Sequence, residues 1–484
     1  MLLFAASPAL ATDDPDPAAL RSALASKAPP RLVWSGEHLP TISATSSGGA
    51  FQIGGRCESG RPVVISGAGV ANPEEVDCVD GRYTTRGAAF DPSREIVATQ
   101  TLFDGSILAA RKLPSASEGN ERRASPADLE AVFASAQPGD RIVLEPGTYS
   151  DVVVRLKAGK RGAGDHPIVI DGRNAVTLSG KSGISVESGS VILRGLIFRE
   201  VGPRAAVTIS APGVRITESR FLACGDPRRP QAECLIVRQG GKNAEIDFNS
   251  FVDSKSMSIK VRAGADGAAD QPVGVSIHHN EFRDIRRLSG NGQEPIQIAG
   301  PGGGGTKAML RTRIEHNLFY RAEGDREAVS LKGPGALVRW NVFRDMDAAP
   351  TLRGGYESII AGNILIRTRS IRIAGRKHRV FGNVILCPRN RGSAIMVLHG
   401  SHGYGVAADN VIRANVFAAA KYAVIFAAQT QPPQTAASGN RIVENLFYLP
   451  KSGTAFRLSP EALAGEIKAT NTLDESIRNA ALCQ

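Results

Sequence analysis

Asparagine recurs at the spacing of a short structural repeat in this 484-residue chain. Asn317, Asn341, Asn363 and Asn383 are separated by 24, 22 and 20 residues, and each precedes a short apolar run. The runs are rich in β-branched residues and lack the apolar spacing of an amphipathic helix. Repeats of roughly 20 residues built from short strands indicate a solenoid with one coil per repeat. We therefore predict an all-β chain dominated by a right-handed parallel β-helix.

A second period, in register with the first, places basic residues at strand ends. Lys332, Arg353 and Arg372 close such strands at spacings of 21 and 19 residues. Because adjacent coils stack about 4.8 Å apart, we expect these cations in one row on the outer face. Asp325 and Glu327 precede the row on one side of an extended chain. A polyanion would neutralise the cations and a metal the acids, whereas a solvated basic edge is the alternative.

Charge favours an acidic partner. Lys plus Arg exceed Asp plus Glu by 58 to 47, which gives a net charge of +11. That excess suits nucleic acid, membrane or acidic glycan, and by itself does not choose among them. The sequence shows no apolar stretch long enough to span a bilayer.

The chain before the helix divides into three segments. Residues 1–11 end in a small-x-small pattern, which predicts the end of a secretory signal that starts upstream and a periplasmic or secreted protein; a disordered tail is the alternative. Residues 12–30 are expected to be a linker. Residues 31–115 alternate strand-like runs with turn residues, which predicts a separate β-sandwich. The pattern resembles small bacterial immunoglobulin-like modules, and a Cys57–Cys78 disulfide would suit an exported domain.

Residues 120–484 are expected to form the β-helix. Ser125 reads as the N-cap of a short helix that covers its open end. The repeated motif, as in DFNSF and RWNVF, predicts asparagines in left-handed corners that bond in a ladder, followed by Phe in the core. Two further cysteine pairs are open: Cys224 with Cys234 could close a loop, and Cys387 could pair with Cys483.

Four motifs then occur in a fixed order, namely PGDRIVLEPGTYSDVVV, NGQEPIQI, GDREAVSLK and TLRGG. With them, the segment from about 125 to 385 resembles the family 6 polysaccharide lyases, which include alginate lyases and chondroitinase B. The resemblance implies that Lys332 is the catalytic base and Arg353 the catalytic acid or charge-stabilising arginine. It also implies Ca²⁺ ligands, whose oxygen-only chemistry suits that ion: Asn291, Asp325 and Glu327, with Glu294 beside them.

The chain departs from the family pattern at three places. Asp325 stands where the family commonly has Glu, and Gln297 stands where many members carry a substrate-binding Arg. The usual Arg-His-Gly appears as Arg353 followed by two glycines. We assign substrate binding to Gln297, Arg372 and Arg376.

These residues suit β-elimination on a uronate polymer. A bound cation neutralises the uronate carboxylate, and a base then removes the C5 proton. We therefore expect a calcium-assisted lyase of an anionic polysaccharide such as alginate or chondroitin and dermatan sulfate, acting as a monomer without nucleic acid. A non-catalytic glycan-binding β-helix and a uronan C5-epimerase are the alternatives.

Overall fold

The computed structural model describes residues 30, 32–34, 43–47, 50–58, 61–67, 74–85, 96–102, 106–112, 120–157, 166–299, 307–389, 392–400, 404–418, 420–428, 436–449, 453–457 and 472–473. The chain forms two compact units, one within Val33–Lys112 and one within Leu113–Gln484 together with Pro30–Leu32. The predicted signal segment, almost all of the predicted linker and Cys483 lie outside the described residues.

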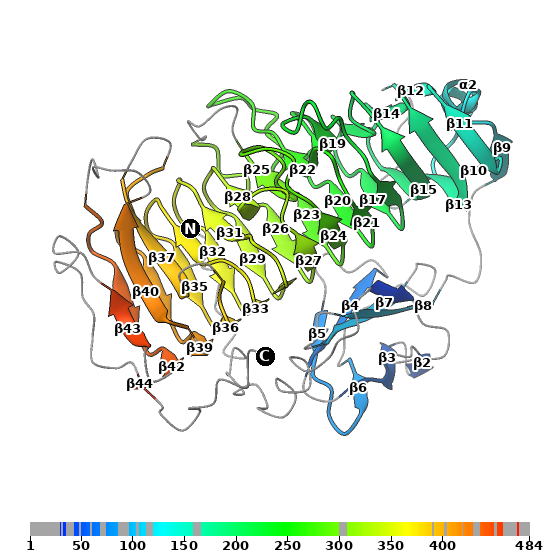
Figure 1. Cartoon of the computed structure of the whole chain (residues 1–484). Helices are drawn as coiled ribbons and strands as arrows, with labels where there is room; N and C mark the ends of the chain where they lie inside the picture. Colours follow the sequence, from blue (N-terminus) through cyan, green and yellow to red (C-terminus); the bar gives the residue numbers. More distant parts are fainter. Residues whose placement is uncertain are drawn as a thin grey trace. The chain divides into compact units, whose positions relative to one another are not determined.

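The first unit contains two sheets (Figure 1). One sheet has the order β1 (Leu32–Trp34), β8 (Ile107–Lys112), β7 (Ile96–Thr101), β4 (Val63–Gly67) and β5 (Glu74–Val76); the other has β2 (Ser43–Ser47), β3 (Ala50–Arg56) and β6 (Arg82–Thr84). β7 pairs antiparallel with β4 and β8, and β3 does so with β2 and β6. Ile53, Ile65 and Tyr83 share one buried core, and the predicted Cys57–Cys78 disulfide is present. Two sheets around one core support the predicted β-sandwich. Its resemblance to immunoglobulin-like modules stays a prediction.

The second unit is built from three parallel sheets that stack coil on coil (Figure 1). The sheet that carries the site contains β12 (Val153–Leu156), β14 (Gly183–Val186), β16 (Val207–Ile209), β19 (Glu233–Val237), β22 (Met257–Val261), β25 (Ile296–Ile298), β28 (Glu327–Leu331), β31 (Ala349–Leu352), β34 (Ile371–Ile373), β37 (Ser393–His399), β40 (Tyr422–Ala428) and β43 (Thr454–Arg457). We call it the site sheet.

The other two sheets share the long strands β13 (Ile168–Gly180) and β15 (Val191–Val201). One continues through β9 (Glu121–Ala124), β10 (Arg141–Leu144), β17 (Arg215–Thr217), β20 (Glu245–Asp247), β23 (Ser276–His278), β26 (Arg313–Glu315), β29 (Leu337–Arg339), β32 (Ile359–Ala361), β35 (Arg379–Phe381), β38 (Val411–Arg413) and β41 (Arg441–Val443). The other continues through β11 (Gly147–Ser150), β18 (Arg220–Leu222), β21 (Ser250–Val252), β24 (Glu281–Ile285), β27 (Leu318–Ala322), β30 (Val342–Arg344), β33 (Ile364–Ile366), β36 (Val384–Leu386), β39 (Val416–Ala418), β42 (Leu446–Tyr448) and β44 (Thr472–Leu473). Three strands per coil confirm the predicted parallel β-helix.

The asparagine ladder is present at the corner between the two other sheets. The backbone N–H and the side-chain Nδ2 of Asn317 donate to Oδ1 of Asn341 at 2.9 and 3.0 Å, and Asn341 repeats this toward Asn363. The prediction that the asparagines themselves take the left-handed conformation is wrong. The preceding residue takes it, as at His316 with φ 54° and Trp340 with φ 62°. Phenylalanines that follow the asparagines stack in the core, as predicted.

The helix α2 (Leu129–Ser135) lies at the N-terminal end of the coil stack, where it buries Leu129 and Phe133 (Figure 1). It begins later than predicted, because Ser125 accepts the Asp128 N–H within a preceding turn. Cys224 and Cys234 form the expected loop-closing disulfide. Within the described part of the chain, no helix has the length and apolar character needed to cross a membrane.

Candidate active site

Lys332 and Arg353 occupy equivalent positions in adjacent coils. Each directly follows a strand of the site sheet, β28 for Lys332 and β31 for Arg353. Leu331 pairs with Leu352, and the Arg353 N–H donates to the Leu331 carbonyl at 2.8 Å. The 21-residue spacing therefore places the two cationic side chains one coil apart, as predicted from the sequence.

Arg372 does not continue that row. It pairs with Thr351, whereas Ile373 pairs with Leu352, so the position equivalent to Arg353 is Ala374. The spacing from Arg353 to Arg372 is two residues short of a full coil. Because side chains alternate with a period of two, Arg372 still points to the same face. It stands in a neighbouring row with Thr351 and Ser330.

Glu327 is the carboxylate that lies against both Arg353 and Arg372. Its Oε1 lies 3.0 Å from Arg372 Nη2 and accepts the Tyr404 hydroxyl at 2.8 Å. Its Oε2 accepts the Ser330 hydroxyl and lies 4.0 Å from Arg353 Nη1. Burial opposes ionisation, but the Arg372 and Arg353 charges outweigh it and hold the pKa of Glu327 below its ordinary value. Glu327 is therefore an ionised group at neutral pH.

Glu294 faces Lys332. Glu294 Oε1 lies 3.6 Å from Lys332 Nζ and accepts the Gln297 side-chain N–H at 2.8 Å. Its other oxygen is buried and has no hydrogen-bond partner among the described residues. Burial raises the pKa of Glu294; Lys332 opposes the rise, and the carboxylate of Asp325 adds to it. Lys332, the candidate base, thus lies against the carboxylate of Glu294, one oxygen of which has no hydrogen-bond partner among the described residues.

Tyr404 is a site residue that sequence reasoning missed. Its ring lies under two guanidinium groups, with Arg353 at 4.6 Å and Arg372 at 5.7 Å from the ring centroid. Its hydroxyl also accepts from Arg372 Nη1 at 3.2 Å. Burial, with Glu327 adding to it, raises the pKa of Tyr404 to about 12, so the hydroxyl stays protonated. Tyr404 comes from the segment after β37, and its only sequence signal is a Gly- and His-rich loop.

The predicted calcium ligands face different partners. Asp325 accepts the Gly292 N–H at 3.0 Å and the Glu327 N–H at 3.1 Å. Glu327 faces the arginines. Asn291 is exposed and hydrogen-bonds through its backbone to Ser289. Glu294, rather than Asn291, is the ligand-type side chain that interacts electrostatically with both acids.

The predicted substrate contacts differ in exposure. Gln297 is buried, aligned with Lys260 and Ser330, and committed to Glu294. Arg372 is buried and committed to Glu327 and Tyr404. Arg376 is exposed on the turn after β34, where its backbone bridges to both neighbouring coils.

A stack of parallel coils with basic side chains and paired acids on one sheet defines a solenoid protein, here a parallel β-helix, with a charged site on one face. The family model described as Chondroitinase B matches residues 124–444, about two thirds of the chain. The chain therefore belongs to the chondroitinase B family of polysaccharide lyases.

Solved structures agree with that fold. A variant of the PL6 family alginate lyase AlyGC has a TM-score of 0.67 at 21% identity, over 74% of this chain and 52% of that one. This chain thus spans about half the length of that lyase. A PL6 family polysaccharide lyase from Pseudopedobacter saltans has 0.59 at 20% identity, over 73% and 91%. A mannuronic acid specific family 6 lyase from human gut microbiota has 0.58 at 21%, over 72% and 84%. No curated protein matches the chain.

Proposed function

We propose that this protein cleaves an anionic, uronate-containing polysaccharide by β-elimination. The observation that carries the proposal is the pairing of Lys332 with Arg353 at equivalent positions of adjacent coils. One amine and one guanidinium, one coil apart, can reach the same sugar from the same side. Family membership supports the reaction type, and the alginate lyase and the mannuronic acid specific lyase among the similar structures support alginate as one candidate polymer.

Lys332 is the proposed base that takes the C5 proton. Its side chain is 12% exposed, so it can meet a substrate while Glu294 holds its position. Arg353 is the proposed partner that stabilises the negative charge developing on the uronate. Its side chain is 20% exposed and its Nη1 lies 4.0 Å from Glu327, beyond hydrogen-bond distance, so the guanidinium retains capacity to bind an oxygen. Tyr404 supports the Arg353 guanidinium from below.

Arg372 and Gln297 are proposed to act mainly by positioning. Arg372 fixes Glu327 and Tyr404, and Gln297 fixes Glu294. Arg376, exposed at the edge of the same sheet, remains the proposed direct contact to a neighbouring sugar.

We also propose Ca²⁺ as the cofactor. The support is chemical rather than geometric: Asn291, Asp325 and Glu327 offer the oxygen donors that Ca²⁺ prefers, whereas among the described residues the carboxylates of Glu294, Asp325 and Glu327 do not form one cluster of ligand atoms. Asp325 and Glu327 would hold the ion, with Asn291 at the rim. When bound, the ion would neutralise the substrate carboxylate.

Secretion to the periplasm or the exterior and action as a monomer belong to the same proposal. Two disulfides, Cys57–Cys78 and Cys224–Cys234, support an oxidising compartment.

The test is elimination on a panel of alginates, chondroitin sulfate and dermatan sulfate. A lyase forms a conjugated unsaturated uronate that absorbs in the ultraviolet, whereas a binding module or an epimerase does not. We expect Lys332→Ala to abolish this absorbance while binding to the polymer persists. The matched control is Lys242→Ala, which removes an exposed lysine from the turn before β20. Normal turnover by Lys332→Ala would show that this lysine is not the base.

A further inference from the structure

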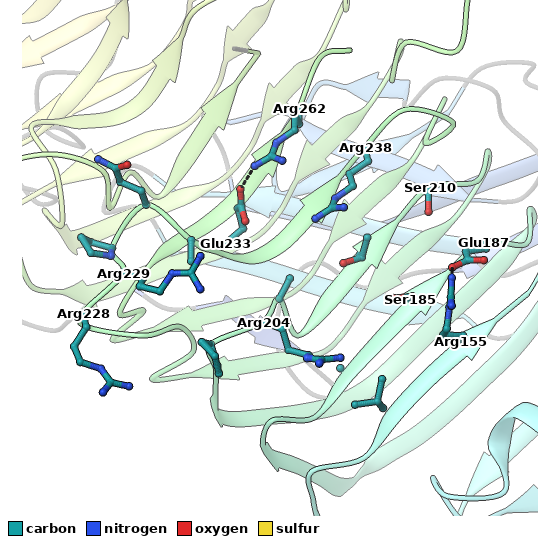
Figure 2. A pocket seen from close by; sticks show the side chains of 18 of the residues that line it. Arg155, Ser185, Glu187, Arg204, Ser210, Arg228, Arg229, Glu233, Arg238 and Arg262 are labelled. Carbon is teal, nitrogen blue, oxygen red and sulfur yellow. Dashed lines mark hydrogen bonds and ion pairs between the residues drawn. The ribbon is translucent and has the colours of Figure 1, made fainter. Parts of the chain in front are cut away.

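A groove of about 1290 Å³ lies over the N-terminal coils of the site sheet. Its lining holds six arginines and two glutamates, so their formal charges sum to +4. Figure 2 shows these arginines around the groove, on several coils of the stack. They are Arg155, Arg204, Arg228, Arg229, Arg238 and Arg262. We call this surface the arginine groove.

Half of these cations keep their charge available. The other half are paired with acids: Arg155 with Glu187 at 2.8 Å and Arg262 with Glu233 at 2.7 Å (Figure 2), and Arg228 with Asp226 at 3.2 Å. Three exposed guanidinium groups make no salt bridge within the described part of the chain: Arg204, Arg229 and Arg238. An unneutralised group of arginines in a concave surface favours an anionic ligand.

The arginine groove is in register with the catalytic pair. Arg238 directly follows β19, Arg262 directly follows β22, and Lys332 directly follows β28. In each case the backbone N–H donates to the carbonyl of the preceding coil, Ile209, Val237 and Ile298 respectively. Successive coils therefore place five residues in one column beside the site sheet: Arg238, Arg262, Ala299, Lys332 and Arg353. Three coil steps of about 4.8 Å separate Arg238 from Lys332, or about 14 Å.

The arginine groove also reaches the catalytic cluster directly. Asn291 lines its end, and the next residue, Gly292, donates its N–H to Asp325. The Cys224–Cys234 disulfide closes the loop that carries Arg228 and Arg229. The loop is thus held in place, which reduces the entropy lost when a ligand binds.

We propose that the arginine groove binds the stretch of an anionic polysaccharide chain that extends beyond the bond being cleaved. The inference rests on the proposed function, and adds that the protein favours long chains over short ones. Guanidinium groups pair with carboxylate or sulfate through two parallel hydrogen bonds. Several such contacts on one chain act together, because the first contact raises the local concentration of the next charged group.

The test removes the three available charges together in the variant Arg204→Ala/Arg229→Ala/Arg238→Ala. The matched control removes three exposed cations from the other sheets and turns: Arg220→Ala/Lys242→Ala/Arg379→Ala. Substrates are long alginate and dermatan sulfate chains, and oligosaccharides too short to reach from Lys332 to Arg238. We expect the groove variant to raise KM for long chains about tenfold at unchanged kcat, since exposed ion pairs contribute modestly and add together. Short substrates and the control should show no change.

Binding is measured separately by affinity electrophoresis in gels that contain the long polymer, which needs no turnover. Weaker retention of the groove variant than of the control supports the arginine groove even if no polymer is cleaved. Equal retention and equal KM on long chains overturn the arginine groove and leave cleavage at Lys332 standing. An equal rise in KM on short oligosaccharides also overturns it, because the arginines would then act at the cleavage point.

Discussion

The substitution Glu294→Gln removes the charge of Glu294 and keeps the shape of its side chain. The carboxylate lies 3.6 Å from Lys332 Nζ and favours the protonated amine, whereas a base must be neutral. Glutamine keeps the oxygen that accepts the Gln297 N–H at 2.8 Å but carries no charge. We therefore expect the variant to remain active at lower pH than the parent protein.

The size of the effect follows from the distance. Two unit charges about 4 Å apart interact by about 4 kcal/mol at an effective dielectric constant of about 20. The amine is partly exposed, so solvent and salt screen the attraction. After this discount, the rate of the variant on the acidic side of the profile should exceed that of the parent by about tenfold or more.

The assay is the initial rate of unsaturated product formation across pH. The parent is compared with Glu294→Gln and with Glu145→Gln, a control at an exposed glutamate between β10 and β11. An acidic limb that stays in place, or that moves to higher pH, would refute the assignment of Lys332 as a base opposed by Glu294.

Four further outcomes are expected. Glu294→Gln should raise Tm at neutral pH, because the raised pKa of Glu294 makes its ionised form destabilising; the gain should vanish below the pKa of the unfolded carboxyl. Glu327→Gln should lower Tm, since Arg372 loses a buried charged partner; the lowered pKa of Glu327 means that this loss is present at neutral pH and fades as pH falls through that pKa. Tyr404→Phe keeps the ring under Arg353 but removes the hydroxyl bound to Glu327, so its kcat should fall about tenfold to hundredfold. Tyr404→Leu also removes the ring, so its kcat should fall further. Chelation should abolish elimination and lower Tm, and added Ca²⁺ should restore both; unchanged activity and Tm would exclude the ion.

The sequence predicts the ladder well but places its strained residue one position late. Asparagine tolerates a left-handed backbone better than most residues other than glycine, so assigning it to the corner followed from intrinsic preference. The ladder imposes a different demand, because each amide must face the next asparagine. The residue before it then bears the positive φ, even where that residue is Phe248 or Trp340. Contacts between coils override the local preference.

The pairing of Lys332 with Arg353 could also be predicted from contacts between coils. The positions of the other residues around this pair could not. The spacing from Lys332 to Arg353 equals one coil, so stacking alone brings them together. The spacing to Arg372 differs by two residues, and only the pairing of Thr351 with Arg372 reveals the shift. Tyr404 lies 77 residues from Glu327, its hydrogen-bond partner. No local pattern connects two residues that meet only after several coils have stacked.

The largest difference between the prediction and the structure concerns which groups neutralise the charges of the acids and of the cations. Sequence reasoning assigned the acids to a metal and the cations to a polymer. In the structure, Glu294 and Glu327 lie against Lys332, Arg353 and Arg372, so the cluster neutralises much of its own charge. The cations are not equal in this respect. Arg372 is bound to Glu327 at 3.0 Å and its side chain is 10% exposed, whereas Arg353 lies 4.0 Å from Glu327 and its side chain is 20% exposed. A substrate carboxylate that enters this site would therefore find its strongest available partner in Arg353, the residue directly beside the proposed base.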